Sequence, residues 1–117
     1  MNLPALYHWT PRDRREKIRE HGLVPYKPTS LVSDDATAEW AHGFGCVCFG
    51  FNPARAWHLS GGMQHVGEIE EWDLWQLPRI LSTDEVRIRS EFGSELLEAR
   101  IFNPLAADRL WWVGARS

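Results

Sequence analysis

The chain has 117 residues, a length that fits one folded domain and leaves no room for a second independent core. Apolar residues make up 44% and charged residues 25%, which is the composition of a globular rather than a disordered protein. The formal net charge of −3 argues against broad electrostatic attraction to nucleic acid, and no apolar run approaches the roughly 20 residues that span a bilayer. We therefore expect a single domain over residues 1–117 with no part in a membrane.

The compartment is indicated by the N-terminus and the cysteines. The first residues contain no basic region followed by an apolar core, so we expect no signal peptide. Cys46 and Cys48 lie two positions apart on an expected strand, where the backbone resists closing a disulfide. Free, buried thiols are typical of a reducing compartment, so we expect a cytoplasmic protein.

The first elements are a short strand over residues 5–9 and a helix over residues 11–21. Thr10 can cap this helix and, with Asp13, completes a T-x-x-D capping box. Gly22 supplies the stop signal. The helix is mostly charged, so we expect it to pack on a sheet by one narrow apolar stripe.

The middle of the chain predicts a loop over residues 25–35 and a short helix over residues 36–42. The apolar run 46–49 is bounded by glycines and predicts a buried strand. Asn52 then caps another helix, which the glycine pair 61–62 ends.

The second half of the chain consists mainly of strands. We predict strands over residues 69–77, 86–89, 96–102 and 110–113, with a helical turn that begins at Asn103. The fold class is therefore α+β, with two to three short helices and several short strands.

Local charge differs from the overall charge. Five of the thirteen basic residues lie in the eight-residue stretch 12–19 of the first helix: Arg12, Arg14, Arg15, Lys17 and Arg19. Such a run is either a solvated helix face or a patch that contacts phosphate.

The first strand carries the first candidate site residues. His8 and Thr10 lie two positions apart and so share one face of this strand. A histidine at a strand end, with a hydroxyl nearby, can hold a sugar hydroxyl or a carboxamide by direct hydrogen bonds. The alternative is a structural histidine that bonds the backbone of the next loop.

Glu95 is the candidate catalytic residue. It stands where a turn gives way to an apolar strand, and a carboxylate at the mouth of a strand is rigidly placed yet reaches a ligand. The alternative is an ordinary exposed glutamate.

These segments resemble the ADP-ribosyltransferase superfamily, most closely its small bacterial and phage members. The chain is also similar to the DarT-like DNA ADP-ribosyltransferases and, more distantly, to the tRNA 2′-phosphotransferases. The family has the pattern "LYH-x-T", then "GL-x-P", an apolar strand with "P-x-x-A", a Glu before an apolar strand, and "I-x-P", and this chain offers a counterpart to each motif in this order. The counterparts are residues 6–10, 22–25, 46–56, 95–97 and 101–104, and the last strand follows them. In the counterpart of "I-x-P", the two residues Phe102-Asn103 stand between Ile101 and Pro104.

The resemblance implies an ADP-ribosyltransferase-like fold, in which two small, mostly antiparallel sheets form a cleft that binds NAD as a substrate. His8 would hold the ribose or the carboxamide, and Thr10 would support it. Glu95 would accept a hydrogen bond from the ribose 2′-hydroxyl. Cleavage of the nicotinamide–ribose bond builds positive charge on the sugar, which a fixed carboxylate stabilises in the transition state.

Four further residues are candidates for binding NAD. Trp57 and Tyr26 are the aromatic rings on which nicotinamide could stack, although both residue types pack in cores more often than they serve as platforms. Arg12 and Arg55 could meet the pyrophosphate, because the guanidinium group matches phosphate geometry.

Two departures from the family pattern narrow the range of possible acceptors for ADP-ribose. Arginine-targeting toxins use a Glu-x-Glu pair, whereas here Glu95 is followed by Glu98, which disfavours an arginine acceptor. Tyr7-His8 does not supply the Arg-His pair on which the tRNA phosphotransferases rely. The acceptor of ADP-ribose is thus a nucleic acid base, another protein or water, and loss of activity with retention of the fold is a further alternative.

Two other ideas concern a metal and a binding surface. The histidines and cysteines between residues 42 and 65 match no zinc spacing, so we expect no metal. A different class of function is a non-catalytic module of the same fold, which would hold a partner protein or a nucleotide on a tryptophan-rich surface formed by Trp72, Trp75, Trp111 and Trp112.

Overall fold

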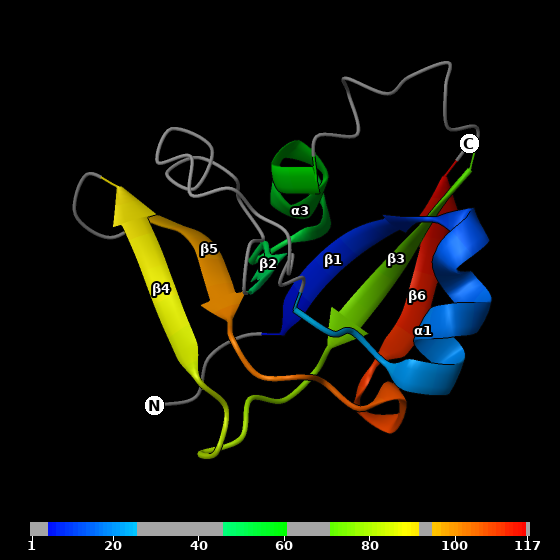
Figure 1. Ribbon diagram of the computed structural model, residues 1–117. Coiled ribbons are helices and arrows are strands. Elements are labelled where there is room, and N and C mark those ends of the chain that lie inside the picture. Colours follow the sequence, from blue (N-terminus) through cyan, green and yellow to red (C-terminus); the bar gives the residue numbers. More distant parts are fainter. Residues whose placement is uncertain (1–4, 26–45, 61–70, 92–94, 117) are drawn as a thin grey trace, which may run out of the picture.

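The computed structural model contains two antiparallel sheets of three strands each (Figure 1). The model describes residues 5–25, 46–60, 71–91 and 95–116, and for residues 89–91 and 95–97 it describes the backbone alone. The first sheet has the order β1-β3-β6, with the bounds Leu6–Pro11, Trp72–Leu77 and Trp111–Arg116. The second sheet has the order β2-β5-β4, with the bounds Val47–Phe49, Glu95–Ile101 and Val86–Glu91.

Two α-helices and two short 3-10 helices accompany these sheets in the described part. Helix α1 (Arg15–His21) follows the 3-10 turn η1 (Arg12–Arg14) and lies beside β6 in Figure 1. Helix α3 (Pro53–Ser60) follows β2, and η3 (Ala107–Arg109) precedes β6. The α+β class predicted from the sequence is confirmed.

The two sheets meet at one backbone bridge. Tyr7 on β1 and Gly50 after β2 exchange two N–H···O hydrogen bonds, each of 2.9 Å. The six strands therefore follow one another across the molecule as β4-β5-β2-β1-β3-β6. Strand β2 stands between β1 and β5.

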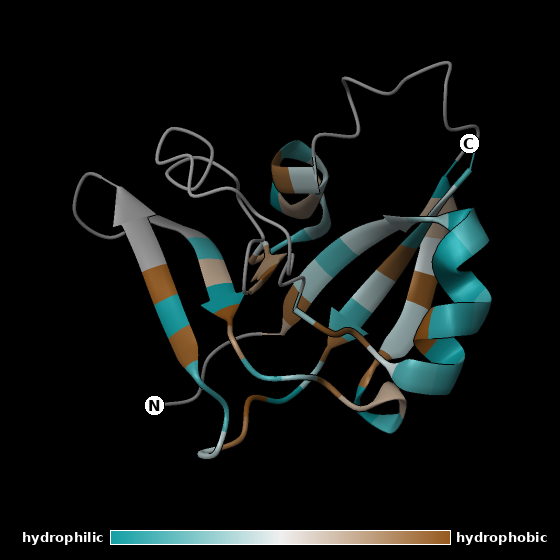
Figure 2. Cartoon of the chain, in the orientation of Figure 1, coloured by the Kyte–Doolittle hydropathy of each residue, from teal (hydrophilic) through white to brown (hydrophobic). Residues whose placement is uncertain are grey.

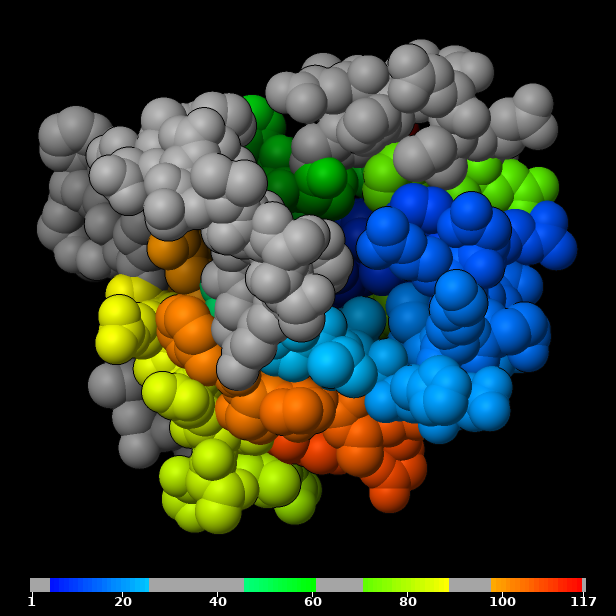
Figure 3. Space-filling model, in the orientation of Figure 1, coloured from blue at the N-terminus to red at the C-terminus, as the bar shows by residue number. Residues whose placement is uncertain are grey.

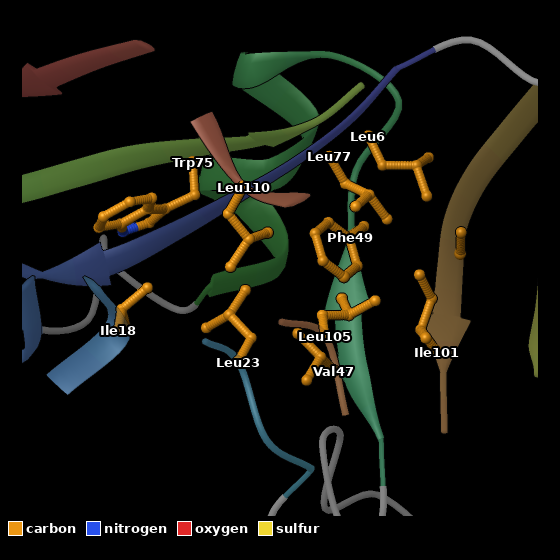
Figure 4. Packing of buried hydrophobic residues seen from close by; sticks show 11 residues of the cluster. Leu6, Ile18, Leu23, Val47, Phe49, Trp75, Leu77, Ile101, Leu105 and Leu110 are labelled. Carbon is orange, nitrogen blue, oxygen red and sulfur yellow. The ribbon is translucent and has the colours of Figure 1, made fainter. Parts of the chain in front are cut away.

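The apolar core lies between the two sheets. Phe49 from β2 is completely buried and is surrounded by apolar side chains from both halves of the chain (Figure 4). The fully or almost fully buried members of this cluster are Leu6, Phe49, Leu77, Ala99, Ile101 and Leu105. Because these residues come from β1, β2, β3 and β5 and from the segment before η3, the core binds both sheets into one unit.

Helix α1 contributes little to this core. It is hydrophilic over most of its length (Figure 2), and Ile18 is its one buried residue. This arrangement agrees with the single apolar stripe predicted from the sequence.

The predicted start of the first helix is wrong. Thr10 and Pro11 belong to β1, and the α-helix begins only at Arg15. The Thr10 hydroxyl does not cap a helix; it is buried and accepts a hydrogen bond of 2.9 Å from the Trp75 indole N–H. A buried indole N–H without an acceptor is costly, and this requirement outweighs the local capping signal.

The predicted end of the first helix is confirmed. Gly22 has a φ of 77°, and its N–H donates to Ile18 O at 2.7 Å. Leu23 and Leu105 then exchange two backbone hydrogen bonds of 2.9 and 2.8 Å. Figure 3 shows the end of α1 (blue to cyan) beside the segment that leads to η3 (orange).

The other predicted elements have mixed outcomes. Asn52 caps α3 as predicted, since its Oδ1 accepts a hydrogen bond of 2.7 Å from the Arg55 backbone N–H. The strands of the second half are present with bounds that differ by a few residues. The predicted helix over 36–42 and the helix stop at 61–62 lie outside the described residues.

The helical turn predicted at Asn103 is wrong, because the turn forms at Ala107. Asn103 instead accepts a hydrogen bond from the Glu85 backbone N–H at 2.7 Å and donates to Asp84 at 2.9 Å. The Asp84 carboxylate also accepts hydrogen bonds from both terminal nitrogens of Arg109, at 2.8 and 2.6 Å. The hydrogen bonds from Arg109 lower the pKa of the buried Asp84 carboxyl to about 2. This network ties the β3–β4 connection to the β5–β6 connection.

Gly22→Ala is predicted to destabilise the fold by more than about 2 kcal/mol, because a Cβ would lie 1.9 Å from Leu105 O and the φ is positive. The measurement is chemical unfolding. The control is Gly114→Ala, whose new Cβ would meet only Leu74 side-chain atoms at 3.7 Å. Equal stability of the two variants would contradict this account of the turn.

Candidate functional site

His8 is fixed by β2. Its Nδ1 lies 2.7 Å from the Cys48 carbonyl oxygen, so Nδ1 carries the proton and donates it. The imidazole ring also lies against Phe49, with 5.5 Å between ring centroids. Burial lowers the pKa of His8, and the hydrogen bond to Cys48 only partly opposes this. His8 is therefore neutral near pH 7, with Nε2 as a hydrogen-bond acceptor.

His8 therefore has the structural role that was the alternative to ligand binding, since its ring bonds to the backbone. The bonded carbonyl belongs to β2 rather than to the loop that follows β1. The role does not compete with ligand binding, because the backbone carbonyl takes Nδ1 and the tautomer leaves Nε2 as an acceptor. Thr10, in contrast, is 2% exposed and bonded to Trp75. That Thr10 supports a ligand stays a prediction. In the structure its hydroxyl contacts the buried Trp75 indole N–H.

Glu95 is the first residue of β5, and its backbone pairs with Glu91 on β4. Strand β5 pairs with β2 through Phe49 and Ala99, one residue from the Tyr7–Gly50 bridge. Glu95 lies four residues before Ala99, which is roughly 13 Å along a strand. Two strand spacings, roughly 10 Å, separate β1 from β5. The backbones of His8 and Glu95 thus lie on strands that only β2 separates.

The register of β5 is irregular near Glu95. Arg89 pairs with Glu98 but Ser90 pairs with Leu96, so β5 has one extra residue at this point. Such a bulge interrupts the alternation of successive residues between the two faces. The E-x-x-E spacing of Glu95 and Glu98 therefore cannot be interpreted as in a regular strand.

An ion pair with a buried carboxylate lies further along β5 and was missed by sequence reasoning. Glu98 is completely buried; its Oε1 accepts a hydrogen bond of 2.9 Å from Arg100 Nε and lies 2.8 Å from Arg100 Nη2. Arg100 pairs in register with Cys48 on β2. The signal in the sequence was an E-x-R pair inside an apolar strand, where both side chains share a face.

The cysteines are free, as predicted. Cys46 is buried and Cys48 is half-buried. Burial raises the pKa of Cys48 to about 12, with a further contribution from the neighbouring Cys46. Cys48 is thus a thiol rather than a nucleophilic thiolate at neutral pH.

Trp57 joins an aromatic cluster that attaches α3 to the first sheet. Its ring meets Trp9 and Trp72 edge-on, with centroid distances of 5.6 and 5.1 Å. The Arg116 guanidinium lies 3.9 Å from the Trp57 ring centroid. The Trp9 indole also donates a hydrogen bond of 2.9 Å to Pro53 O. A nicotinamide that stacks on this face of Trp57 would have to displace Arg116.

The remaining predicted NAD contacts lie on different elements. Arg12 is exposed, forms an ion pair with Glu71 and lies four residues beyond His8. Arg55 is half-buried on α3, the helix that also carries Trp57. Tyr26 lies outside the described residues. Arg55 and Trp57 thus lie on one helix, and Arg12 follows the end of β1, where Pro11 pairs with the Trp72 that contacts Trp57.

A second buried carboxylate, Asp73 on β3, was not predicted to have a role. It is completely buried and accepts two hydrogen bonds from Arg15, at 2.9 and 2.7 Å. The Trp112 indole donates a third, at 3.1 Å, and Arg15 also lies over the Trp112 ring at 4.7 Å. The hydrogen bonds to Asp73 raise the pKa of Arg15. Asp73 therefore joins α1, β3 and β6.

The predicted four-tryptophan surface is wrong. Trp72 and Trp75 are 5% and 3% exposed and belong to the interior, whereas Trp111 and Trp112 are 58% and 46% exposed. Two tryptophans fill the space between the sheet and its helices, which is the commoner use of this residue.

Comparison of the chain with family models, with curated proteins and with solved structures found no match. Within the described ranges, no group of three or more His, Cys, Asp or Glu side chains converges to hold a metal ion. No helix in the same ranges is long and apolar enough to cross a membrane.

Asp73→Asn is predicted to lower the thermal midpoint of unfolding by about 5 °C or more. The substitution removes the buried negative charge to which Arg15 and the Trp112 indole N–H donate hydrogen bonds. The control is Glu16→Gln on α1, whose carboxylate is 84% exposed and lies 4.0 Å from Arg19. An exposed pair of this kind contributes little, so the control is expected to unfold like the wild type. Equal midpoints for both variants would contradict the role assigned to Asp73.

Proposed function

We propose that the chain is an NAD-dependent ADP-ribosyltransferase-like enzyme with His8 and Glu95 in its site. The observation that carries the proposal is the position of β2, which hydrogen-bonds to His8 and pairs with the strand that begins at Glu95. Two small antiparallel sheets joined at Tyr7 and Gly50 are consistent with the cleft-forming sheets that the sequence resemblance implies.

His8 binds NAD in the proposed enzyme. Its proton is on Nδ1, held by Cys48, so Nε2 accepts a hydrogen bond from a ribose hydroxyl or from the carboxamide N–H₂. Because the ring is neutral, it adds no positive charge beside the oxocarbenium-like sugar of the transition state.

Glu95 has the catalytic role in this proposal. Its carboxylate accepts a hydrogen bond from the ribose 2′-hydroxyl and stabilises the positive charge that develops as nicotinamide leaves. Trp57 or Tyr26 stacks on nicotinamide, Thr10 supports His8, and Arg12 or Arg55 meets the pyrophosphate. ADP-ribose then passes to a nucleic acid base, a protein or water. Free thiols at Cys46 and Cys48 support a cytoplasmic location, where NAD is present.

The second candidate function is a non-catalytic binding module. The exposure of Trp111 and Trp112 favours it, and Trp72 and Trp75 no longer belong to its surface. Such a module would bind a partner protein or a nucleotide without turnover.

Glu95→Gln is predicted to lower nicotinamide release from NAD at least about 100-fold, because the amide keeps the shape of the side chain but not its charge. The measurement is chromatographic quantification of free nicotinamide after incubation of the protein with NAD. The control is Glu20→Gln on α1, an exposed glutamate outside the site.

Equal release by the wild type and Glu95→Gln would remove Glu95 from its role. Calorimetry with NAD separates the two candidate functions. Binding with no release by the wild type supports the module, whereas release that depends on Glu95 supports the enzyme.

A further inference from the structure

Arg14 differs from the other arginines in the segment 12–19. Each of the others has an acidic partner or neighbour, and these pairs are Arg12–Glu71, Arg15–Asp73 and Arg19–Glu16. Arg14 is exposed, and no carboxylate in the described part of the chain forms an ion pair with it. Its guanidinium group therefore keeps its N–H donors for water or for an anionic ligand.

The backbone beside Arg14 is fixed over the face of the first sheet that carries His8. Asp73 on β3 pairs in register with Thr10, which lies two residues from His8 on β1, so these three side chains share one face. Arg15 donates two hydrogen bonds, of 2.9 and 2.7 Å, to the completely buried Asp73 carboxylate. This ion pair holds the start of α1 against the face of His8, and Arg14 directly precedes it.

Arg14 also stands on the inner side of α1. It precedes Ile18 by four residues and has helical backbone angles, with φ −91° and ψ −4°, so the two side chains lie on the same side of the helix. Ile18 is buried in the same cluster as Trp75 (Figure 4), and Trp75 pairs in register with His8. Burial is the largest cause of the lowered pKa of His8, and the positive charge of Arg14 lowers it further. The guanidinium group is therefore close enough for its charge to act on the imidazole ring.

We propose that Arg14 and His8 form one binding site for NAD, in which Arg14 holds the pyrophosphate. The inference rests on the proposed function for the ribose contact of His8. That ribose carries the pyrophosphate on its 5′ carbon, so a nucleotide held by His8 brings its negative charge to the same face of the sheet. A guanidinium group matches two phosphate oxygens at once. We assign this contact to Arg14 rather than to Arg12, because Arg12 is bound to Glu71.

The two residues divide the recognition of the ligand. The neutral His8 ring accepts a hydrogen bond at Nε2, whereas Arg14 supplies positive charge. The bond that breaks lies in the nicotinamide riboside part of NAD, and the negative charge lies in the pyrophosphate. Arg14 therefore acts on affinity, and it selects ligands that carry phosphate over nicotinamide riboside, which carries none.

Arg14→Gln is predicted to raise the dissociation constant of NAD at least about tenfold, because it removes a charge-assisted contact with the pyrophosphate. The same variant is expected to bind nicotinamide riboside like the wild type. The measurement is calorimetry with both ligands. The control is Arg79→Gln, the same change at an exposed residue in the connection from β3 to β4. This control is expected to bind NAD like the wild type.

Inorganic pyrophosphate tests the anion site without the chemistry of NAD. Titrated into the ¹⁵N-labelled wild type, it is expected to shift the NMR signals of the His8 imidazole. Arg14→Gln is expected to weaken this binding at least about tenfold. Circular dichroism verifies that the variant is folded.

The outcomes separate this inference from the proposed enzyme. Equal affinity of the wild type and Arg14→Gln for NAD would overturn the inference, and nicotinamide release that depends on Glu95 would then still support the enzyme. Conversely, binding of NAD and pyrophosphate that depends on Arg14, without nicotinamide release, would support the inference and contradict the proposed catalysis. Pyrophosphate that leaves the His8 signals unchanged at saturation would also overturn the inference.

Discussion

Two backbone hydrogen bonds between Tyr7 and Gly50 are the constraint on which the rest of the structure depends. They join two sheets that share no other strand pairing in the described part of the chain. The first turn of α3 packs directly on this point, since a Cβ on Gly50 would lie 2.4 Å from the Ala56 backbone nitrogen. A strand, a second strand and a helix can meet here only because residue 50 has no side chain. The hydrogen bond from His8 to Cys48 lies next to this bridge and fixes the imidazole ring.

Buried polar groups then hold the first sheet to its surroundings. Thr10 accepts the hydrogen bond of Trp75, and Asp73 accepts those of Arg15 and Trp112. Each donor would otherwise lose its hydrogen bond to water on burial, so these pairs restrict which strands can be neighbours. Asp73 also links the interior to the exposed edge of the sheet, because it accepts a hydrogen bond from the Trp112 indole N–H.

Features that depend on neighbouring residues could be predicted from the sequence. Gly22 ends a helix, Asn52 caps one, and the apolar run around Phe49 is a buried strand. These predictions succeed because the signal and its effect lie within a few residues of each other. The α+β class follows from the same local patterns.

Features that depend on distant partners could not be predicted in this way. The capping signal at Thr10 was overruled by Trp75, 65 residues away. Composition alone does not distinguish the buried Trp72 from the exposed Trp111, because that difference arises from the position of α3 and from the edge of the sheet. The bulge in β5 depends on its register with β4, so the spacing of Glu95 and Glu98 has no fixed meaning before pairing is known.

For the candidate site, the sequence predicts His8 and Glu95, and the structure places β2 between the strands that carry these two residues. The most direct test of this arrangement is titration of NAD into the ¹⁵N-labelled protein, with the amide chemical shifts followed by NMR. The account predicts that the largest shift changes fall on the amides of β1 around His8 and of β5 from Glu95 to Glu98. Changes confined to other elements, or none at saturating NAD, would contradict it.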